Sequence, residues 1–488
     1  MFSFFPELGL HVQGVINIVY LLTVIFIATL IVLENRSPIK TISWILVLIL
    51  LPFAGIIIYL FFGQEYRKKK MFSRKGLHDL EKLRKLTQSQ LDQLPKNYAA
   101  LSDKIFHKKR LMNLMLANSN ALLSDDNEVK ILRNGEQAFP AIFQAIEEAR
   151  HHIHLQFYIV DDDITGNQLR ELLIQKAAAG VEVRFIYDDV GSWKLPKKYI
   201  RSLREAGVKI DCFIRVRFPM LTSKVNYRNH RKIVVVDGTT AFVGGLNIAD
   251  RYLNGTKILG SWRDTHLMLK GGAATGLQIV FMADWYFVSK EILQGERYFR
   301  PLEPGKGKIV QIVASGPDSD WESLTQAYFS AIASAHDKVY IATPYLIPNS
   351  EIGSAMKVAA LSGIDIRILL PGRSDAIIPK WGTHSYISEL LEAGVRIYFY
   401  QPGFMHSKLM VVDGVFSSVG TANLDFRSME TNFEVNAMIY NERTARELEK
   451  HFMNDLKQSR EIILSEWEQR PRLSKAKESF ARLLSPLL

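Results

Sequence analysis

The hydrophobic pattern opens with two long uncharged stretches, residues 12–33 and 41–62. Each is long enough to cross a bilayer core of about 30 Å at about 1.5 Å per residue. The connector between them is short and contains Pro38. Residues 1–66 are therefore predicted to form a transmembrane hairpin, with two buried core helices as the alternative. Pro52 and Gly55 are expected to kink the second span.

Basic residues crowd the exit of the second span. They are Arg67, Lys68, Lys69, Lys70, Arg74 and Lys75, against Arg36 and Lys40 in the connector. Because positive charge favours the cytoplasmic side, the N-terminus and everything after Phe62 are predicted to be cytoplasmic. The same cluster is expected to bind an anionic membrane surface. No Lys or Arg precedes Val12, which argues against a signal peptide.

A polar linker occupies residues 67–128. The spacing of its leucines predicts an amphipathic helix through Leu77, Leu80, Leu83 and Leu91, and a second helix over residues 102–123. Nothing in this segment indicates catalysis.

From Val129 onward the chain repeats a pattern of helices and strands. Three pairs of segments match: Phe143–Ala149 with Phe329–Ala335, Gly180–Ile186 with Gly363–Leu369, and Glu205–Ile210 with Glu392–Ile397. Alternation of helix and strand predicts α/β layers, and two large copies indicate paired domains rather than an array. We expect pseudo-repeated α/β/α domains over residues 129–300 and 308–488, joined by the Pro- and Gly-rich segment 301–307.

The C-terminal segment has its own amphipathic pattern. Its apolar residues recur at helical spacing and basic residues lie between them: Leu473, Ala476, Phe480, Leu483 and Leu487, with Arg472, Lys475, Lys477 and Arg482. Such a helix suits a membrane surface, and packing against its own domain is the equal alternative.

Composition limits the function further. The net charge of +11 indicates an anionic partner, which could be nucleic acid, an acidic membrane or a phosphate-bearing substrate. Hydrophobic content of 48% excludes a disordered chain. The single cysteine, Cys212, excludes an internal disulfide and a Cys-rich metal site, and its apolar surroundings predict a core residue.

Two copies of one polar motif carry the candidate chemistry. Each copy has a His, a Lys two residues later, an Asp five beyond the Lys and an Asn seventeen beyond the His. The two sets are His230, Lys232, Asp237 and Asn247, and His406, Lys408, Asp413 and Asn423. Each His–Lys pair leads into a β-branched apolar run, so both side chains should point to the same side of a strand.

Two imidazoles, two ammoniums and two amides suit a single phosphodiester. Lys232, Lys408, Asn247 and Asn423 are predicted to hold the non-bridging oxygens. One neutral imidazole can attack phosphorus and form a phosphohistidine, and the other can protonate the departing alkoxide. Gly244, Gly245 and Gly420 would allow the backbone to approach the phosphate closely. No metal or other cofactor is expected.

An acidic residue behind each imidazole would orient it and stabilise its charged form. We expect Asp264 behind His230 and Glu434 behind His406. Although Asp237 and Asp413 complete the predicted catalytic motifs, each stands just before a glycine at a strand end. Their expected role is therefore structural.

Three further histidines, His151, His152 and His154, resemble a metal-binding cluster only superficially. They lie at a predicted helix–strand junction without acidic or cysteine partners at ligand spacing. A core or solvated role is favoured.

The paired motifs resemble those of the phospholipase D superfamily. Longer strings resemble the bacterial cardiolipin synthases within it: Arg228–Gly238, Trp262–His266, Gly420–Glu434, Arg36–Leu46 and Leu51–Gly55. The superfamily often has Gly-Ser where this chain has Gly-Gly in the first copy and Gly-Thr in the second.

The resemblance implies two phospholipase D-like domains around one active site in a bacterial cell membrane. It implies that two phosphatidylglycerol molecules, donor and acceptor, become cardiolipin and glycerol without a cofactor. By analogy His230 is the expected nucleophile and His406 the acid and base, and the reverse assignment stays open. Apolar residues ahead of each motif, Phe218, Met220, Leu221, Phe404 and Met405, either enter the membrane interface or pack in the core.

Other functions remain as alternatives. A phospholipase D-type hydrolase or another phosphatidyltransferase, such as a phosphatidylserine synthase, would use the same residues. A nuclease would gain nothing from a membrane hairpin, so nucleic acid is not an expected partner. A non-catalytic lipid-binding scaffold would not require both histidines. Homo-oligomerisation is left open.

Overall fold

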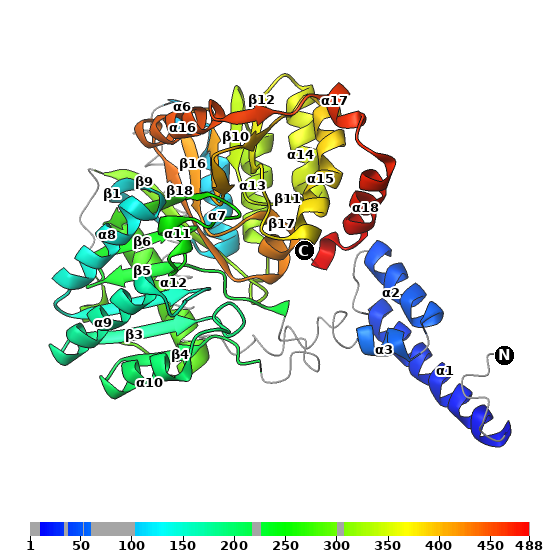
Figure 1. Ribbon diagram of the computed structural model, residues 1–488, viewed down its shortest axis with the longest axis horizontal. Coiled ribbons are helices and arrows are strands. Elements are labelled where there is room, and N and C mark those ends of the chain that lie inside the picture. The colour runs from blue at the N-terminus through cyan, green and yellow to red at the C-terminus, as the bar shows by residue number, and fades with distance from the viewer. Residues whose placement is uncertain are drawn as a thin grey trace. The chain divides into compact units, whose positions relative to one another are not determined.

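The computed structural model describes residues 10–33, 38–51, 53–59, 103–216, 226–299 and 307–487 (Figure 1). Within these ranges, the N-terminal helices and the α/β body that begins at residue 103 belong to two separate compact units. In Figure 1 the ribbon of the body runs from cyan to red and carries both repeats.

The N-terminal unit contains α1 (Leu10–Leu33), α2 (Pro38–Leu50) and α3 (Ala54–Ile58). Among the described residues, only α1 includes an apolar stretch long enough to cross a membrane, Gly14–Leu33. The second predicted span, residues 41–62 with its expected kink, is divided among the described residues into the two helices α2 and α3. The helix α2 has 13 residues, or about 20 Å, and Phe53 after it adopts a φ of 60°, which no right-handed helix contains.

A proline has no backbone N–H and disfavours helical geometry at the residue before it. The predicted kink at Pro52 lies outside the described residues, but the end of α2 at Leu50 fits this effect. Within the unit, Ile27 and Ile31 of α1 pack with Leu48 of α2. Most other apolar side chains of α1 are exposed, so α1 is not the core helix of a globular domain and fits membrane association.

The predicted basic cluster after the second span and the predicted helix through Leu77 and Leu91 lie outside the described residues. The predicted helix over residues 102–123 is instead two helices, α6 (Asp103–Phe106) and α7 (Lys109–Ser119). The second ends because Asn120 adopts a left-handed φ of 51°, a common helix terminator. A strand begins at Leu123, six residues before the predicted start of the first repeat.

The first repeat alternates strands with helices. Its strands are β1 (Leu123–Arg133), β2 (His152–Phe157), β3 (Glu182–Tyr187), β4 (Lys209–Cys212), β5 (Ile233–Val236), β6 (Thr240–Gly244), β7 (Ser261–Arg263) and β8 (Thr265–Lys270). Its helices are α8 (Asn134–Glu148), α9 (Ile164–Ala178), α10 (Lys197–Glu205), α11 (Arg251–Asn254), α12 (Gly272–Ser289) and the single turn η5 (Glu296–Tyr298).

The second repeat follows the same plan. Its strands are β9 (Lys308–Ser315), β10 (Lys338–Ala342), β11 (Leu346–Ile347), β12 (Asp365–Pro371), β13 (Arg396–Tyr400), β14 (Gly403–Met405), β15 (Leu409–Val412), β16 (Phe416–Gly420), β17 (Leu424–Asp425), β18 (Glu434–Tyr440) and β19 (Ser459–Glu461). Its helices are α13 (Ser323–Ala333), α14 (Ser350–Leu361), α15 (Ile377–Glu392), α16 (Glu442–Leu456), α17 (Leu464–Glu468) and α18 (Arg472–Leu483), with short turns η6 (Arg427–Thr431) and η7 (Ser485–Leu487).

Strand order confirms the internal repeat. In the first repeat, neighbouring strands run β1-β8-β6-β5-β2-β3-β4, and in the second they run β9-β18-β16-β15-β10-β12-β13. The long strand β1 belongs to both sheets, because its first residues pair with β9 and Glu128–Arg133 pair with β8. The pairing with β9 contains a register shift between Ser124 and Asn127.

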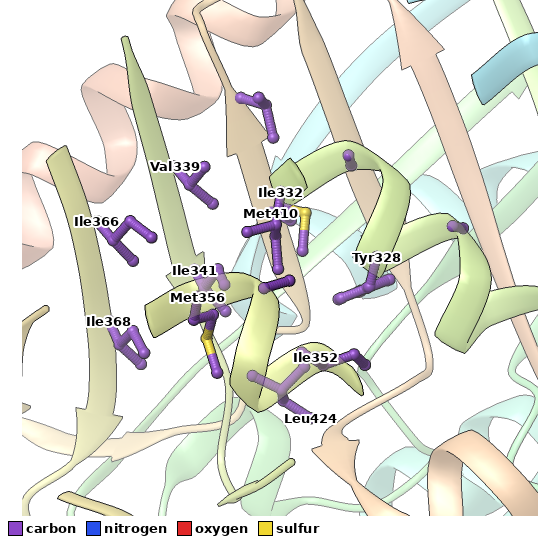
Figure 2. Packing of buried hydrophobic residues seen from close by; sticks show 14 of the residues in the cluster. Tyr328, Ile332, Val339, Ile341, Ile352, Met356, Ile366, Ile368, Met410 and Leu424 are labelled. Atoms are coloured by element: carbon purple, nitrogen blue, oxygen red, sulfur yellow. The ribbon is translucent and has the colours of Figure 1, made fainter. Parts of the chain in front are cut away.

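Three hydrophobic cores hold the layers together. Helices α7, α13 and α14 pack over one face of the second sheet, where Ile341, Ile352, Met356 and Met410 interdigitate (Figure 2). A second core lies under α8, α9 and α10. The third contains buried residues from both sheets together with α12 and α16. Each fully buried side chain of this size contributes about 1.5–3 kcal/mol.

Buried polar residues of the first repeat also belong to this core architecture. His152 and His154 lie on β2 with no exposed surface, and Nε2 of Gln278 lies 2.8 Å from Nδ1 of His154. Burial lowers the pKa of His152 to about 4. These histidines are core residues, as expected, and Cys212 is likewise buried.

Both motif aspartates occupy tight hairpin turns. Asp237 and Gly238 have φ values of 52° and 66°, and Asp413 and Gly414 have 54° and 63°, the left-handed pairing typical of two-residue hairpins. The Asp237 carboxylate accepts hydrogen bonds from the backbone N–H groups of residues 150–152. Asp413 does the same at residues 336–338 and also pairs with Lys108, at 2.9 Å. Each aspartate thus fastens a hairpin to the start of a neighbouring strand.

Candidate active site

His230 enters the site just before β5 and is held by the second repeat. Its backbone N–H donates to the carbonyl oxygen of Phe433, at 2.9 Å, and the N–H of Phe433 donates to that of Arg228. These two backbone hydrogen bonds place Nδ1 of His230 3.0 Å from the Glu434 carboxylate. The imidazole is 12% exposed and the carboxylate is fully buried.

His406 is held in the same way by the first repeat. The short strand β14 runs parallel to β7, and the backbone N–H of His406 then donates to the carbonyl oxygen of Arg263, at 2.8 Å. Nδ1 of His406 lies 2.7 Å from Oδ2 of Asp264. This imidazole is also 12% exposed, over a buried carboxylate.

The predicted pairing of histidines with acids is therefore wrong. The four residues were correctly identified, but the two acids are exchanged. We expected Asp264 behind His230 and Glu434 behind His406, but each carboxylate supports the imidazole of the opposite repeat. The physical reason is that residues 433 and 263 form backbone hydrogen bonds across the repeats. Asp264 follows residue 263 and Glu434 follows residue 433, so these backbone hydrogen bonds place each carboxylate beside the imidazole of the other repeat.

The two lysines are buried beside the imidazoles. Nζ of Lys232 donates to the carbonyl oxygen of His230, and Nζ of Lys408 to that of His406, both at 2.6 Å. Burial and the mutual repulsion of the ammoniums lower the pKa of Lys232 well below its ordinary value. Burial lowers that of Lys408 to about 8. An anion between them would relieve both penalties, so the site is suited to a phosphate group.

The two carboxylates differ in the direction of their pKa shifts. Burial raises the pKa of Asp264 to about 6. Burial acts in the same direction on Glu434, but the nearby His230 and Lys232 and a hydrogen bond from Thr421 outweigh it and leave the pKa lowered. Oγ1 of Thr421 donates to Oε2 of Glu434 at 2.6 Å.

Thr421 has no counterpart behind the other carboxylate. The corresponding residue of the first repeat is Gly245, where a β-carbon would overlap the carboxylate of Asp264. Only glycine therefore lets Asp264 lie where it does, and glycine offers no hydroxyl to it. The small sequence difference between Gly-Gly and Gly-Thr thus has a direct structural effect on the two acids.

Both imidazoles favour the neutral form. Burial lowers the pKa of His230, with Glu434 opposing that effect, whereas burial and the surrounding cations Lys408 and Lys232 lower the pKa of His406 much further. An ionised Glu434 accepts the Nδ1 proton of His230 and leaves Nε2 with a lone pair. When Asp264 is protonated, which its raised pKa favours below about pH 6, it donates to Nδ1 of His406, and Nε2 then carries the hydrogen.

The two motif asparagines, Asn247 and Asn423, are buried and form hydrogen bonds with neighbouring residues. Oδ1 of Asn247 accepts the N–H of Ile159, and its Nδ2 donates to the Tyr252 hydroxyl at 2.6 Å. Nδ2 of Asn423 donates to Asp425 at 3.1 Å. Because an amide nitrogen carries two hydrogens, each asparagine has a second one to offer a phosphate oxygen.

Sequence reasoning missed some residues and misplaced others. Thr421 and Tyr252 were not singled out, although the Gly-Gly to Gly-Thr difference indicated the first; the ring of Tyr252 lies 5.6 Å from that of His406. Phe404 and Met405 are fully buried, so of the two roles expected for them core packing is confirmed and a place in the membrane interface is excluded. The other residues given that role, 218, 220 and 221, lie outside the described residues.

The arrangement suits displacement at phosphorus. It combines an imidazole with an available Nε2, a second imidazole able to carry a proton there, and two buried ammoniums. In the described part of the chain, no group of three or more His, Cys, Asp or Glu side chains is placed to hold a metal ion.

Comparisons with known proteins agree with this chemistry. The family model described as "Cardiolipin synthase, PLD-like domain" matches residues 142–257 and 328–456, and the model described as "Phospholipase_D-nuclease N-terminal" matches residues 15–64. A solved structure of phosphatidylserine synthase from Haemophilus influenzae has a similar fold, with a TM-score of 0.60 at 14% identity over 78% of this chain and 100% of that one.

Among curated proteins, a cardiolipin synthase of Geobacillus sp. (strain WCH70) is 45% identical over 97% of this chain and 94% of its own length. A cardiolipin synthase of Alkalihalophilus pseudofirmus is 46% identical over 97% and 94%. A probable cardiolipin synthase of Bacillus subtilis is 40% identical over 99% and 96%. The chain therefore belongs to the cardiolipin synthase family, and is a phosphatidyltransferase with two phospholipase D-like domains.

Proposed function

We propose that this chain converts two phosphatidylglycerol molecules into cardiolipin and glycerol at one site between its repeats. The observation that carries the proposal is the pair of imidazole–carboxylate contacts that cross between the repeats. Because each half supplies the acid of the other, both imidazoles belong to one catalytic unit. Membership of the cardiolipin synthase family supports the choice of substrates.

In the first step, Nε2 of His230 attacks the phosphorus of the donor lipid. The bond from phosphorus to the glycerol oxygen breaks, and that oxygen takes the proton from Nε2 of His406. This assignment follows from the two acids: ionised Glu434 leaves His230 nucleophilic, whereas the His406–Asp264 pair can hold a proton for the leaving group. The ionised Glu434 also stabilises the positive charge of the phosphohistidine ring.

In the second step, the headgroup hydroxyl of the acceptor phosphatidylglycerol gives its proton to Nε2 of His406. The freed oxygen attacks phosphorus, and the bond between phosphorus and His230 breaks. One phosphodiester replaces another, so the exchange needs no other source of energy. Lys232, Lys408, Asn247 and Asn423 hold the non-bridging oxygens throughout.

Water is the competing acceptor. Both imidazoles are only 12% exposed, which limits access of solvent to the phosphohistidine and favours an oriented lipid hydroxyl. All of these residues come from a single chain, so the reaction does not require a second copy.

The proposal also includes a location. The catalytic body would lie on the cytoplasmic side of the bacterial cell membrane, as part of a multi-pass protein. The apolar helix α1 and the basic sequence after the second apolar stretch support this placement.

The decisive experiment supplies phosphatidylglycerol alone to the full-length protein in detergent–lipid micelles. Cardiolipin together with an equal amount of glycerol is the expected product, and phosphatidic acid would instead indicate a hydrolase. His230→Ala and His406→Ala should each abolish transfer, and activity that survives in either variant contradicts the two-imidazole mechanism. Trapping the phosphoenzyme should label His230, and a label on His406 would reverse the roles.

A further inference from the structure

The C-terminal helix α18 packs on the body through an unexpected face. Its buried side chains are Glu478 and Ala481, and Glu478 pairs with Arg470 at 2.6 Å. Near its C-terminal end, Arg482 donates to the carbonyl oxygen of Ser385 on α15 at 2.9 Å. The helix is thus attached to its domain by polar contacts rather than by its apolar stripe.

The apolar stripe faces away from the body. Leu473, Phe480 and Leu483 are 68%, 63% and 77% exposed. At about 100° per residue, these three side chains fall within a sector about 80° wide, and the buried pair lies on roughly the opposite side. A stripe of this kind normally covers a core, because apolar side chains gain free energy from leaving water; within the part of the chain that the structure describes, this stripe covers no core.

The charge on the exposed part of α18 is of one sign. Arg472 and Lys475 lie on one side of the apolar stripe and Lys477 on the other, and Glu478, the only acid among the twelve residues of the helix, is buried. Basic side chains beside an apolar sector are the pattern of helices that lie in the headgroup region of anionic membranes.

We propose that α18 docks the catalytic body onto an anionic lipid bilayer, with Leu473, Phe480 and Leu483 inserted below the headgroups. A second copy of the chain fits less well, because twofold pairing would bring like charges together. A helix of 12 residues is also only about 18 Å long and offers little of the roughly 800 Å² per partner that a stable interface needs. The proposal does not depend on the reaction chemistry.

The test uses the full-length protein with its single cysteine, Cys212, replaced by Ala. A polarity-sensitive fluorophore is attached at Phe480→Cys, and at Lys475→Cys as the off-stripe control, in nanodiscs that contain phosphatidylglycerol or only phosphatidylcholine. We expect quenching by aqueous iodide to fall about threefold or more at position 480 in the anionic discs. Position 475 should stay accessible.

Three outcomes would overturn the proposal. Unchanged quenching at position 480 would mean that the stripe stays in water. Equal protection in phosphatidylcholine discs would remove the role of charge. Equal protection in detergent without a bilayer would show that protein, either another segment of the chain or a second copy, covers the stripe.

A functional measurement separates this surface from the site. Replacing Leu473, Phe480 and Leu483 together by Ser should lower transfer on phosphatidylglycerol vesicles severalfold and leave transfer on a water-soluble short-chain phosphatidylglycerol unchanged. Equal losses on both substrates would make the stripe structural and contradict the proposal. If the wild type transfers neither substrate, the proposed function fails, while the quenching result still decides the docking surface.

Discussion

Nδ1 of His406 lies 2.7 Å from Oδ2 of Asp264, a carboxylate that the other repeat supplies. His230 and Glu434 form the reciprocal contact. Each half therefore supplies the acid of the other, and the two imidazoles contact acids whose pKa values are shifted in opposite directions.

Asp264→Asn should remove the pH dependence that the raised pKa creates. The His406–Asp264 pair takes up a proton as the pH falls through about 6, and the protonated pair serves the leaving group. In the wild type, kcat/KM for phosphoenzyme formation should therefore fall as the pH rises above this value. The pH profile of the variant should lack this descending limb. Activity should drop on the order of 10²–10⁴-fold, the range for an acid behind a catalytic imidazole. A descending limb near pH 6 that persists in the variant would exclude Asp264 as its source.

Thr421→Val should weaken the site through Glu434. The hydroxyl that bonds Oε2 of Glu434 is lost while the side-chain volume stays similar. Since this donor lowers the pKa of Glu434, the pKa should rise, and the acid limb of the kcat/KM profile should move to higher pH. A hydrogen bond to a charged group is worth about 1.5–3 kcal/mol, so a loss of about tenfold or more is expected. Thr421→Ser should restore the profile; a Ser variant as impaired as Val would refute the role of the hydroxyl.

Gly245→Ala should disable the first half-site. The new methyl group would overlap the Asp264 carboxylate and displace it from His406, with a loss of activity on the order of 10²-fold from misplaced groups. Gly353→Ala is the matched control, because a β-carbon there meets only Pro348, at 3.8 Å. On the helix α14 that change should stabilise the protein by about 0.5–1 kcal/mol. Full activity in Gly245→Ala would show that Asp264 can move without harm.

Lys108→Met should destabilise the second repeat without changing the chemistry. The Lys108 ammonium, acting against burial, lowers the pKa of Asp413, so this ion pair adds stability above the ordinary pKa of an aspartate, about 3.9. That contribution disappears as the pH falls through the lowered value in the folded protein. The variant should therefore unfold at a higher pH during acidification and lose about 1–3 kcal/mol at neutral pH.

Thermal and acid unfolding of the full-length protein in detergent measure both effects of Lys108→Met. Arg446→Met, which removes a surface pair with Glu442, should change stability by less than about 1 kcal/mol. Equal effects of the two substitutions would contradict a special role for the buried pair.

Much of the fold could be predicted because its signals are local. The strand Ile233–Val236 is buried on both faces, and its continuous apolar run made it recognisable as a strand. The Asp-Gly turns end that strand and its copy in the second repeat, and the recurrence of whole segments predicted the paired domains. The His and Lys positions followed from the same alternation.

The missed features depend on contacts between distant residues. Spacing along the chain could not reveal that residues 263 and 433 each bond the opposite repeat, and this exchange reversed the predicted partners of His230 and His406. Hydrophobicity alone could not separate Phe404, which packs in the core, from a membrane-facing residue. It also could not show that the second apolar stretch divides into two separate helices, α2 and α3.

The presence of Gly245 in the first repeat and Thr421 at the equivalent position of the second also bears on the direction of the reaction. Two identical halves would offer an incoming lipid equivalent routes, and either imidazole could become phosphorylated in a given cycle. A hydroxyl present at residue 421 and absent at 245 breaks that equivalence within one polypeptide. In the proposed mechanism the glycerol would then leave, and the acceptor hydroxyl enter, on the His406 side in every turnover, and each repeat would serve a different step.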